Sequence, residues 1–473
     1  MHPQPVTRLI LILFLPIAFF ACKKDKPSKP LPLPGTPSGL TVTRVSDTGA
    51  VIQWNTADLA TSYVLRLIPK TSFRSTLEYK LAGNDALIKT LTELTPATKY
   101  QVELTAIGDN GKAQPVTADF TTDDADGLVI LGSEDKGIYA FDARNGNQVW
   151  RYPTGGDVLA TPIIKDSIVY VGGFDGRLYA LNAADGSQKW VTRTMRSGSG
   201  ITAPVALSNG RVYLGDYGGW IWAFDATSGM EQWNYVIPSP YKNVNTAPVI
   251  LGDTIMYIAS YDGRVYAFDL RTGTQKWRTE STGNPITSGP AVYNNTIYVG
   301  GTPKLYAFDA GTGAVKWTGY VNGYESFYGS PTISDNKVLI GDDRGIFYAF
   351  DASTGAIVWS KKISGGTIMT SAMVANGVVY ISNGNFVQAM NVSTGNTVWT
   401  NTNIPENVSY SGPTVSEKYV YAGSITGKLY CLDRTTGNIK WSTGNSYQRF
   451  QSCPVVLKYS GKTFHPGITG IVQ

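Results

Sequence analysis

Few residues in this chain have the types and spacing that acid–base catalysis or metal binding requires. Beyond the first 21 residues the only histidine is His465, and no two of the three cysteines are adjacent. Histidine-based proton transfer and a multi-histidine metal site are therefore not expected. The acidic pair Asp342 and Asp343 lies in the stretch GDDRG, which is typical of a solvated hairpin turn. We expect no catalytic residues, no metal and no cofactor.

Aromatic, amide and charged side chains gather instead in four loop-like stretches, IPSPYKNVN, VNGYESFYG, NVSYS and NSYQRFQS. Rigid aromatic rings beside hydrogen-bonding groups suit the face of a sugar or a strand of peptide. The alternative is that the rings fill the interior of the fold. The candidate ligand-binding residues are Tyr241, Asn243, Tyr324, Glu325, Phe327, Tyr328, Tyr410, Tyr447, Arg449 and Phe450.

These loops alternate with a repeated unit that must position them. The stretch YAFDLRTGTQKW, residues 266–277, has close copies along the chain, and successive copies end in tryptophans about 40 to 44 residues apart. This is the period of one four-stranded β-propeller blade. The eight tryptophans are Trp150, Trp190, Trp233, Trp277, Trp317, Trp359, Trp399 and Trp441.

The residues within each copy have structural roles. We expect each tryptophan to pack its indole on the adjacent blade and the turn glycine to adopt a positive φ. An acidic or amide side chain is expected to accept the hydrogen bonds of the turn. These side chains belong to Asp142, Asn182, Asp225, Asp269, Asp309, Asp351, Asn391 and Asp433.

A second marker predicts how the repeats close into a ring. Proline or alanine before two apolar residues predicts the innermost strand of each blade, at Pro162, Pro204, Pro248, Pro290, Pro331, Ala372, Pro413 and Pro454. The first tryptophan precedes the first of these markers, and the last marker follows the last tryptophan. The stretch CPVVLKY near the C-terminus therefore supplies the inner strand of the first blade, which removes the exposed sheet edges of an open array.

The N-terminal stretch predicts export and a flexible tether. An arginine and a short apolar run precede Cys22, and this pattern resembles a bacterial lipoprotein signal, with residues 1–21 removed and Cys22 lipidated. The alternative is ordinary cleavage that leaves a free thiol. Residues 22–36 form a Lys- and Pro-rich tether that carries most of the net charge of +5. The folded parts are left nearly neutral, so nucleic-acid binding is not expected.

Residues 37–122 alternate apolar and polar residues with the period of strands, which predicts a small antiparallel sandwich. Trp54, Tyr63 and the stretch LTPATKY, residues 94–100, resemble the corresponding positions of a fibronectin type III domain. We expect this segment to act as a spacer. Whether Cys431 and Cys453 form a disulfide cannot be decided from their positions in the sequence.

From residue 127 to 473 the repeats resemble those of quinoprotein-like propellers, as in AFDASTGAIVW, residues 349–359. The resemblance implies an all-β fold of eight blades after the sandwich. In the dehydrogenases of that family it also implies pyrroloquinoline quinone over adjacent cysteines, with calcium and an aspartate base. None of those residues has a counterpart here. The anchor and propeller also resemble, in part, the propeller lipoproteins of the outer-membrane barrel-assembly machinery, which lack the sandwich.

Three functional hypotheses follow. The first is a non-catalytic lipoprotein of a Gram-negative outer membrane, on either side of it, whose propeller holds a protein partner. The second is a glycan-binding surface lipoprotein that captures polysaccharides. The third is a quinone-dependent dehydrogenase. The loops between each tryptophan and the next inner strand vary most, and in a propeller they share one face, so we place the binding site there.

Overall fold

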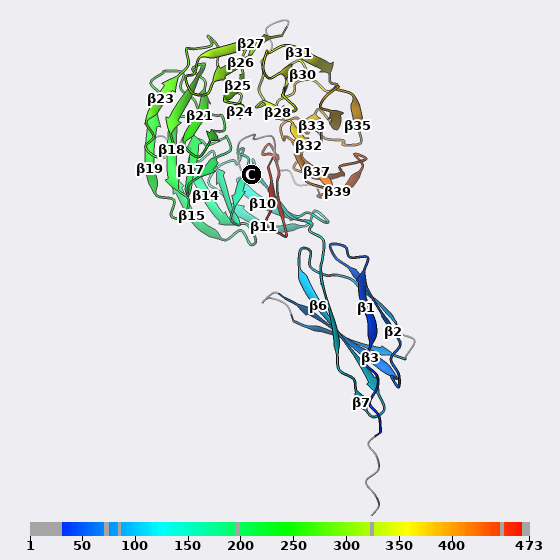
Figure 1. Cartoon of the computed structure of the whole chain (residues 1–473). Helices are drawn as coiled ribbons and strands as arrows, with labels where there is room; N and C mark the ends of the chain where they lie inside the picture. The colour runs from blue at the N-terminus through cyan, green and yellow to red at the C-terminus, as the bar shows by residue number, and fades with distance from the viewer. Residues whose placement is uncertain are drawn as a thin grey trace, which may run out of the picture. The chain divides into compact units, whose positions relative to one another are not determined.

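The computed structural model describes residues 31–70, 75–83, 87–193, 199–321, 326–444 and 449–465. Every regular element in these ranges is a β-strand, and no helix within them is long and apolar enough to cross a membrane. The chain divides into two compact units, Met1–Asp123 and Asp124–Gln473 (Figure 1). The predicted signal peptide and lipidation site, Cys22, lie outside the described residues.

The first unit is the predicted sandwich. One sheet has the order β1-β2-β5 and the other the order β4-β3-β6-β7, with β8 paired to β6. Trp54 and Tyr63 meet edge to face in its core, with ring centroids 5.5 Å apart. The Thr95 N–H donates to Tyr100 Oη at 3.0 Å, as a tyrosine corner requires. The strands are β1 (Ser38–Thr43), β2 (Ala50–Asn55), β3 (Ser62–Pro69), β4 (Leu77–Ala82), β5 (Ile88–Leu91), β6 (Lys99–Gly108), β7 (Gly111–Lys112) and β8 (Val116–Thr121).

The second unit is a propeller of eight sheets in the described ranges, which confirms the predicted fold (Figure 1). We number the blades one to eight, beginning with the sheet that contains β9. Blades two to eight each have four antiparallel strands in chain order.

The strands of blades two to five are β12 (Ile163–Lys165), β13 (Ile168–Gly172), β14 (Arg177–Asn182), β15 (Gln188–Arg193), β16 (Ala206–Ser208), β17 (Arg211–Gly215), β18 (Trp220–Asp225), β19 (Glu231–Val236), β20 (Val249–Leu251), β21 (Ile255–Ser260), β22 (Arg264–Asp269), β23 (Gln275–Arg278), β24 (Ala291–Tyr293), β25 (Thr296–Gly300), β26 (Lys304–Asp309) and β27 (Val315–Tyr320).

The strands of blades six to eight are β28 (Thr332–Ser334), β29 (Lys337–Gly341), β30 (Ile346–Asp351), β31 (Ile357–Lys362), β32 (Met373–Ala375), β33 (Val378–Asn383), β34 (Phe386–Asn391), β35 (Thr397–Asn401), β36 (Thr414–Val415), β37 (Tyr419–Gly423), β38 (Leu429–Asp433) and β39 (Ile439–Ser442).

Blade one closes the ring with strands from both ends of the unit, as the sequence predicts. Its order is β11-β10-β9-β40-β41, and Val455 lies opposite Ile130 in the antiparallel pair of β9 and β40. Its strands are β9 (Asp126–Ser133), β10 (Gly137–Asp142), β11 (Gln148–Pro153), β40 (Val455–Lys458) and β41 (Thr463–Phe464). The β9 strand begins one residue before the predicted start of the propeller at residue 127. The fifth strand, β41, was not predicted, and it lies beyond β40 on the axial side.

A buried lysine fastens this closing strand. The side chain of Lys458 is 2% exposed, and its Nζ lies 3.0 Å from an Asp124 oxygen and 2.8 Å from a Glu417 oxygen. Asp124 begins the propeller unit, whereas Glu417 belongs to blade eight. The single cation therefore joins blade one to blade eight.

The core of the propeller lies between neighbouring blades. In the cluster between blades two and three, Tyr170 and Trp190 come from one sheet, and Trp222 and Phe224 from the next. Residues that alternate along β13, β14, β17 and β18 face these layers, so both faces of each sheet are apolar. This explains the near-continuous apolar runs of the two middle strands in each repeat.

Candidate functional site

The eight repeat tryptophans build the scaffold rather than a site. Seven of their indole N–H groups donate to a carbonyl oxygen of the next blade at 2.9 to 3.1 Å. The pairs are Trp150 with Ala183, Trp190 with Ala226, Trp233 with Leu270, Trp317 with Ala352, Trp359 with Val392, Trp399 with Arg434, and Trp441 with Ala143. The last pair joins blade eight to blade one. Trp277 is the exception, since its buried Nε1 has no hydrogen-bond partner among the described residues.

The turn after the third strand of each blade has the predicted geometry. In blade five, Asp309 Oδ1 accepts the N–H groups of Gly311 and Thr312, both at 3.0 Å, and the Thr312 hydroxyl at 3.1 Å. The Thr312 hydrogen bond, which outweighs the desolvation of the carboxylate, holds the pKa of Asp309 below its ordinary value. Gly313 follows with a φ of +74°. The other seven acidic or amide residues of the repeat accept the equivalent N–H two residues on.

The loops that follow the tryptophans share one face of the propeller with the hairpins between the second and third strands. In blades two, three and four, a backbone hydrogen bond fixes the hairpin to the preceding loop. Phe174 N–H donates to Asp157 O at 2.8 Å, Tyr217 N–H to Gly200 O at 3.0 Å, and Tyr261 N–H to Asn243 O at 2.9 Å. We call this surface the loop-rich face.

Three neighbouring blades present an aromatic side chain at the same position of this face. Phe174, Tyr217 and Tyr261 are 47%, 40% and 39% exposed. The rings of Phe174 and Tyr217 meet edge to face at 5.9 Å between centroids. The equivalent hairpin position is Glu134 in blade one and Asp343 in blade six, each fixed by the same kind of backbone hydrogen bond.

None of these three aromatics is among the ligand-binding residues predicted from the sequence. The signal that would have found them is the aromatic residue before the hairpin turn in FDG, YGG and YDG, at residues 174–176, 217–219 and 261–263. These short stretches lie within the repeat, so the repeat pattern alone does not distinguish them from scaffold residues.

Two of the predicted ligand-binding residues belong to the core. Phe327 and Phe450 are each 1% exposed. The Phe327 ring packs against Tyr348 in blade six, and the Phe450 ring packs against Tyr139 and Phe141 in blade one. This corrects the expectation that they contact a ligand, because both rings are covered by neighbouring strands.

The other predicted residues do not form one site. Tyr241, which is 72% exposed, lies beside blade four, whereas Tyr328 lines the central axis and Tyr410 precedes blade eight. Arg449 lies near Glu134, with Nε and Oε2 3.7 Å apart. Asn243 uses its backbone carbonyl to hold the Tyr261 hairpin. Tyr324, Glu325 and Tyr447 lie outside the described residues.

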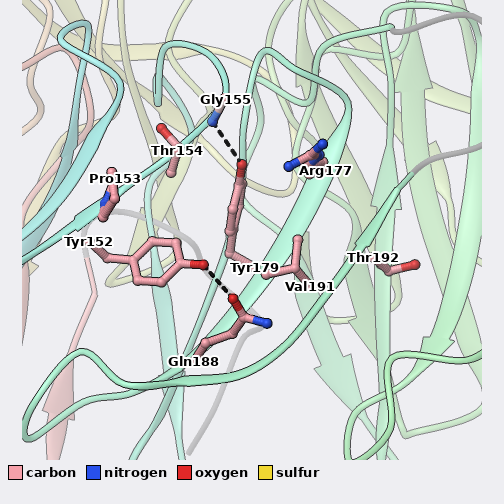
Figure 2. A pocket seen from close by; sticks show the side chains of 9 residues that line it. All are labelled: Tyr152, Pro153, Thr154, Gly155, Arg177, Tyr179, Gln188, Val191 and Thr192. Carbon is pink, nitrogen blue, oxygen red and sulfur yellow. Dashed lines mark hydrogen bonds between the residues drawn. The ribbon is translucent and has the colours of Figure 1, made fainter.

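A cavity of about 590 Å³ lies between blades one and two (Figure 2). Its polar groups are largely used within the protein, since Tyr152 Oη donates to Gln188 at 2.6 Å and Gly155 N–H donates to Tyr179 Oη at 3.1 Å. Arg177 lies 3.7 Å from Asp175. Burial and the neighbouring Asp175 raise the pKa of Tyr179 to about 12. These contacts join two blades and leave few groups for a ligand.

The central axis opens on the loop-rich face as a cavity of about 200 Å³. Residues just before the inner strands line it, and hydrogen bonds link neighbouring blades around it. Ser330 N–H donates to Ser371 Oγ at 2.9 Å, and Cys453 N–H donates to Thr161 Oγ1 at 3.2 Å. Cys431 is buried in another part of the core, and both cysteines are free thiols. Burial raises the pKa of the Cys453 thiol, which disfavours a thiolate.

A family model described as "Outer membrane protein assembly factor BamB" matches residues 100–318, 261–369 and 363–443, which is more than half of the chain. The chain belongs to this family. A second model, described as "Fibronectin type III domain", matches residues 35–122 and confirms the nature of the first unit. A BamB-type propeller is consistent with a scaffold that binds proteins.

Similarity to individual proteins covers parts of this BamB-family chain. Tenascin from Gallus gallus is 33% identical over 86 residues, 18% of this chain and 5% of that protein. A 1-butanol dehydrogenase (quinone) from Thauera butanivorans is 36% identical over 58 residues, 12% of this chain and 9% of that protein. The chain thus spans less than a tenth of the length of either relative. The crystal structure of the computationally designed Ika8 protein shares the fold, with a TM-score of 0.57 and 20% identity over 65% of this chain and 94% of that one.

The axial cavity of this BamB-family propeller does not fit the quinone of the dehydrogenases. Its volume is below the roughly 300 Å³ at which small-molecule sites begin. The described side chains that line it are uncharged, so none can form an ion pair with the carboxylates of pyrroloquinoline quinone, and none supplies a carboxylate to balance the charge of calcium. No group of three or more His, Cys, Asp or Glu residues that could hold a metal ion occurs within the described ranges.

Proposed function

We propose that this chain is a non-catalytic, lipid-anchored outer-membrane protein whose propeller holds a protein partner on the loop-rich face. The BamB description of its family supports the envelope location and the scaffolding role. The lipoprotein-like signal that ends at Cys22 supports the anchor. The uncharged axial cavity supports a role that does not depend on quinone.

The observation that carries the proposal is the exposed ring pair of Phe174 and Tyr217. Aromatic side chains dominate the energetics of protein interfaces because they bury much area while losing few rotamers. Both rings stand on backbone that is hydrogen-bonded to the preceding loop. They therefore offer a preorganised apolar contact, which lowers the entropic cost of binding.

Site-specific photocross-linking in intact cells tests this proposal. A photoreactive phenylalanine analogue would replace Tyr217 in one strain and Asp343, the matched hairpin position of blade six, in another. We expect one discrete protein to cross-link through position 217 and much less of it through position 343. Phe174→Ser in the Tyr217 strain should lower the yield about tenfold or more, whereas Tyr320→Ser on an outer strand should not change it. Equal yields from both hairpins, or no adduct at position 217, would contradict the proposal.

A further inference from the structure

A second cavity on the loop-rich face, of about 390 Å³, lies between the loops that follow Trp233 and Trp277. Tyr241 and Tyr261 contribute its aromatic lining, and its polar lining includes Ser239, Asp262, Ser281 and Asn284. We call it the tyrosine pocket. It falls within the volume range of small-molecule sites, and it does not include the Phe174–Tyr217 pair.

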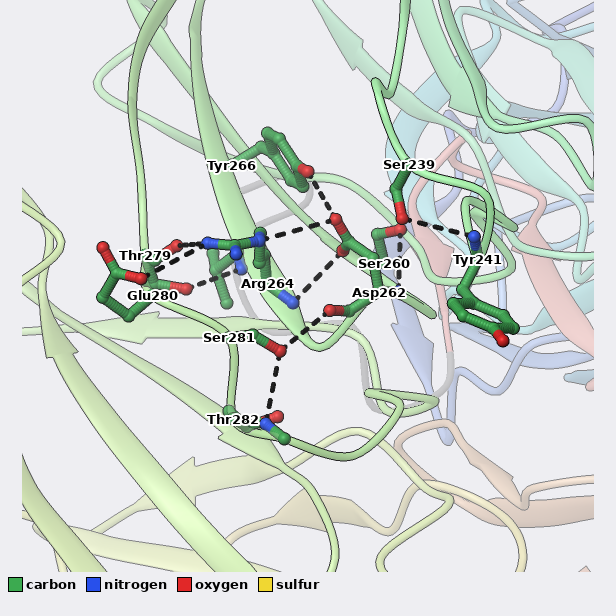
Figure 3. Close-up of polar contacts among 12 residues, drawn as sticks. Ser239, Tyr241, Ser260, Asp262, Arg264, Tyr266, Thr279, Glu280, Ser281 and Thr282 are labelled. Atoms are coloured by element: carbon green, nitrogen blue, oxygen red, sulfur yellow. Dashed lines mark hydrogen bonds and ion pairs between the residues drawn. The ribbon is translucent and has the colours of Figure 1, made fainter.

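The charged groups of the tyrosine pocket are neutralised within the protein (Figure 3). Asp262 accepts the Tyr266 hydroxyl at 2.6 Å, and the Arg264 guanidinium lies 3.8 Å from the same carboxylate. Arg264 in turn donates to Thr279 O at 2.9 Å and lies 3.8 Å from Glu280. The acid is thus already paired with a cation and a hydroxyl, so the pocket favours a neutral ligand.

The backbone around the pocket is also occupied. Tyr241 N–H donates to Ser239 Oγ at 3.2 Å, Asp262 N–H to Ser260 Oγ at 3.4 Å, and Gly283 N–H to Ser281 Oγ at 3.2 Å. The Tyr261 N–H donates to the preceding loop. A peptide that adds as a strand needs free backbone groups, and these donors do not offer them.

The groups that remain available are aromatic faces and hydroxyls. Neither Tyr241 Oη nor Tyr261 Oη has a hydrogen-bond partner in the described part of the chain. Asn284 donates one side-chain N–H to Thr302 O at 3.0 Å, which leaves its side-chain oxygen as an acceptor. Aromatic faces beside hydroxyl and amide groups match a ligand that has both an apolar face and many hydroxyls.

We propose that the tyrosine pocket binds a neutral sugar ring of an oligosaccharide. The ring packs its C–H face on Tyr241 or Tyr261, and its hydroxyls bond to the free tyrosine hydroxyls and to Asn284. This activity goes beyond the protein-binding role proposed above and uses different residues. No covalent step is involved.

Titration of the purified full chain with neutral hexasaccharides tests the proposal. The panel is maltohexaose, cellohexaose, laminarihexaose and mannohexaose, with hexagalacturonic acid as the charged comparison. Saturation-transfer NMR and calorimetry measure binding. We expect saturable binding of at least one neutral sugar, and affinity at least tenfold weaker in Tyr241→Ala and in Tyr261→Ala. Tyr241→Phe, which keeps the ring, should retain affinity within about threefold.

Tyr410→Ala is the matched control, because Tyr410 is an exposed tyrosine near the same face but outside the pocket, and it should leave affinity unchanged. Tyr241 is mostly exposed, so its variants should fold, which thermal unfolding verifies. The proposal is overturned if no neutral hexasaccharide binds, if the charged sugar alone binds, or if the double variant of Tyr241 and Tyr261 binds normally. None of these outcomes depends on the cross-linking result at position 217.

Discussion

At each junction between blades, a tryptophan ring packs against a turn glycine of the next blade, in the space that a side chain would occupy. Gly437 has a φ of +73°, and a Cβ added there would lie 2.4 Å from Trp399 Cε3. The equivalent glycines of the other seven turns meet a tryptophan ring in the same way. Glycine is therefore needed twice at this position, for the backbone conformation and for the close approach of the indole.

A matched pair of substitutions separates these two requirements. Gly377 has the same φ of +73° but nothing within 4 Å of an added Cβ. Gly377→Ala should cost about 1 kcal/mol through backbone strain alone. Gly437→Ala should cost about 1 to 3 kcal/mol more, because Trp399 must move. Chemical denaturation of the two variants measures the difference, and equal losses would show that the tryptophan contact contributes little.

The candidate ligand residues show what a sequence predicts at the scale of single residues. Loop stretches can be found because they interrupt the repeat, but the side of a loop that faces inward depends on tertiary packing. Phe327 and Phe450 are covered for that reason, whereas Tyr241 from the same kind of loop is exposed. Phe174 and Tyr217 were missed because they stand inside the repeated pattern.

Among the elements, the hairpin of β40 and β41 is followed by a partly buried histidine. His465 directly follows β41, and its Nε2 lies 3.1 Å from Thr463 Oγ1. Its Nδ1 is buried without a hydrogen-bond partner among the described residues. Burial lowers the pKa of His465 to about 4. The sequence marked β40 through its proline and apolar residues, but β41 is too short to give a pattern.

The low pKa of His465 should therefore make the stability of the protein depend on pH. The unfolded chain protonates His465 near its ordinary pKa of about 6.5, whereas the folded chain resists protonation until about pH 4. Lowering the pH from 7 to 4.5 should thus cost about 2 to 3 kcal/mol of stability through this group. Buried carboxyls with raised pKa values, such as Asp126, act in the opposite direction, so the comparison must be with His465→Gln. Thermal unfolding at both pH values should show a smaller acid loss in the variant, and parallel profiles would exclude this role of His465.

At the scale of the whole molecule, the closed ring was predictable from two features of the sequence. These are the length of the repeat and the offset between its tryptophans and its inner-strand prolines. The repeated tryptophans give the number of blades, and the displaced proline markers give the shared blade. The sequence does not reveal that Lys458 would be buried between Asp124 and Glu417, because the three residues meet only after the ring has closed.

Removal of the closing strand should destabilise the entire propeller. A chain that ends at Ser452 loses Val455 and Val456, which are fully buried, and leaves β9 as an unpaired edge. We expect aggregation in size-exclusion chromatography or a fall in Tm of more than about 10 °C. A chain that ends at Gly461 keeps β40 and should remain monodisperse. An unchanged Tm in the shorter chain would mean that the ring does not need its shared blade.

The pairing of β9 with β40 also determines the order in which the propeller can fold during synthesis. The strand that completes blade one is made after all the other blades, so the ring cannot close before residues 455–458 have been synthesised. Blades two to eight can assemble locally, but the last contacts wait for residues 455–458. Until then β9 is an exposed edge, and it is the part of the nascent protein that a chaperone would have most reason to hold.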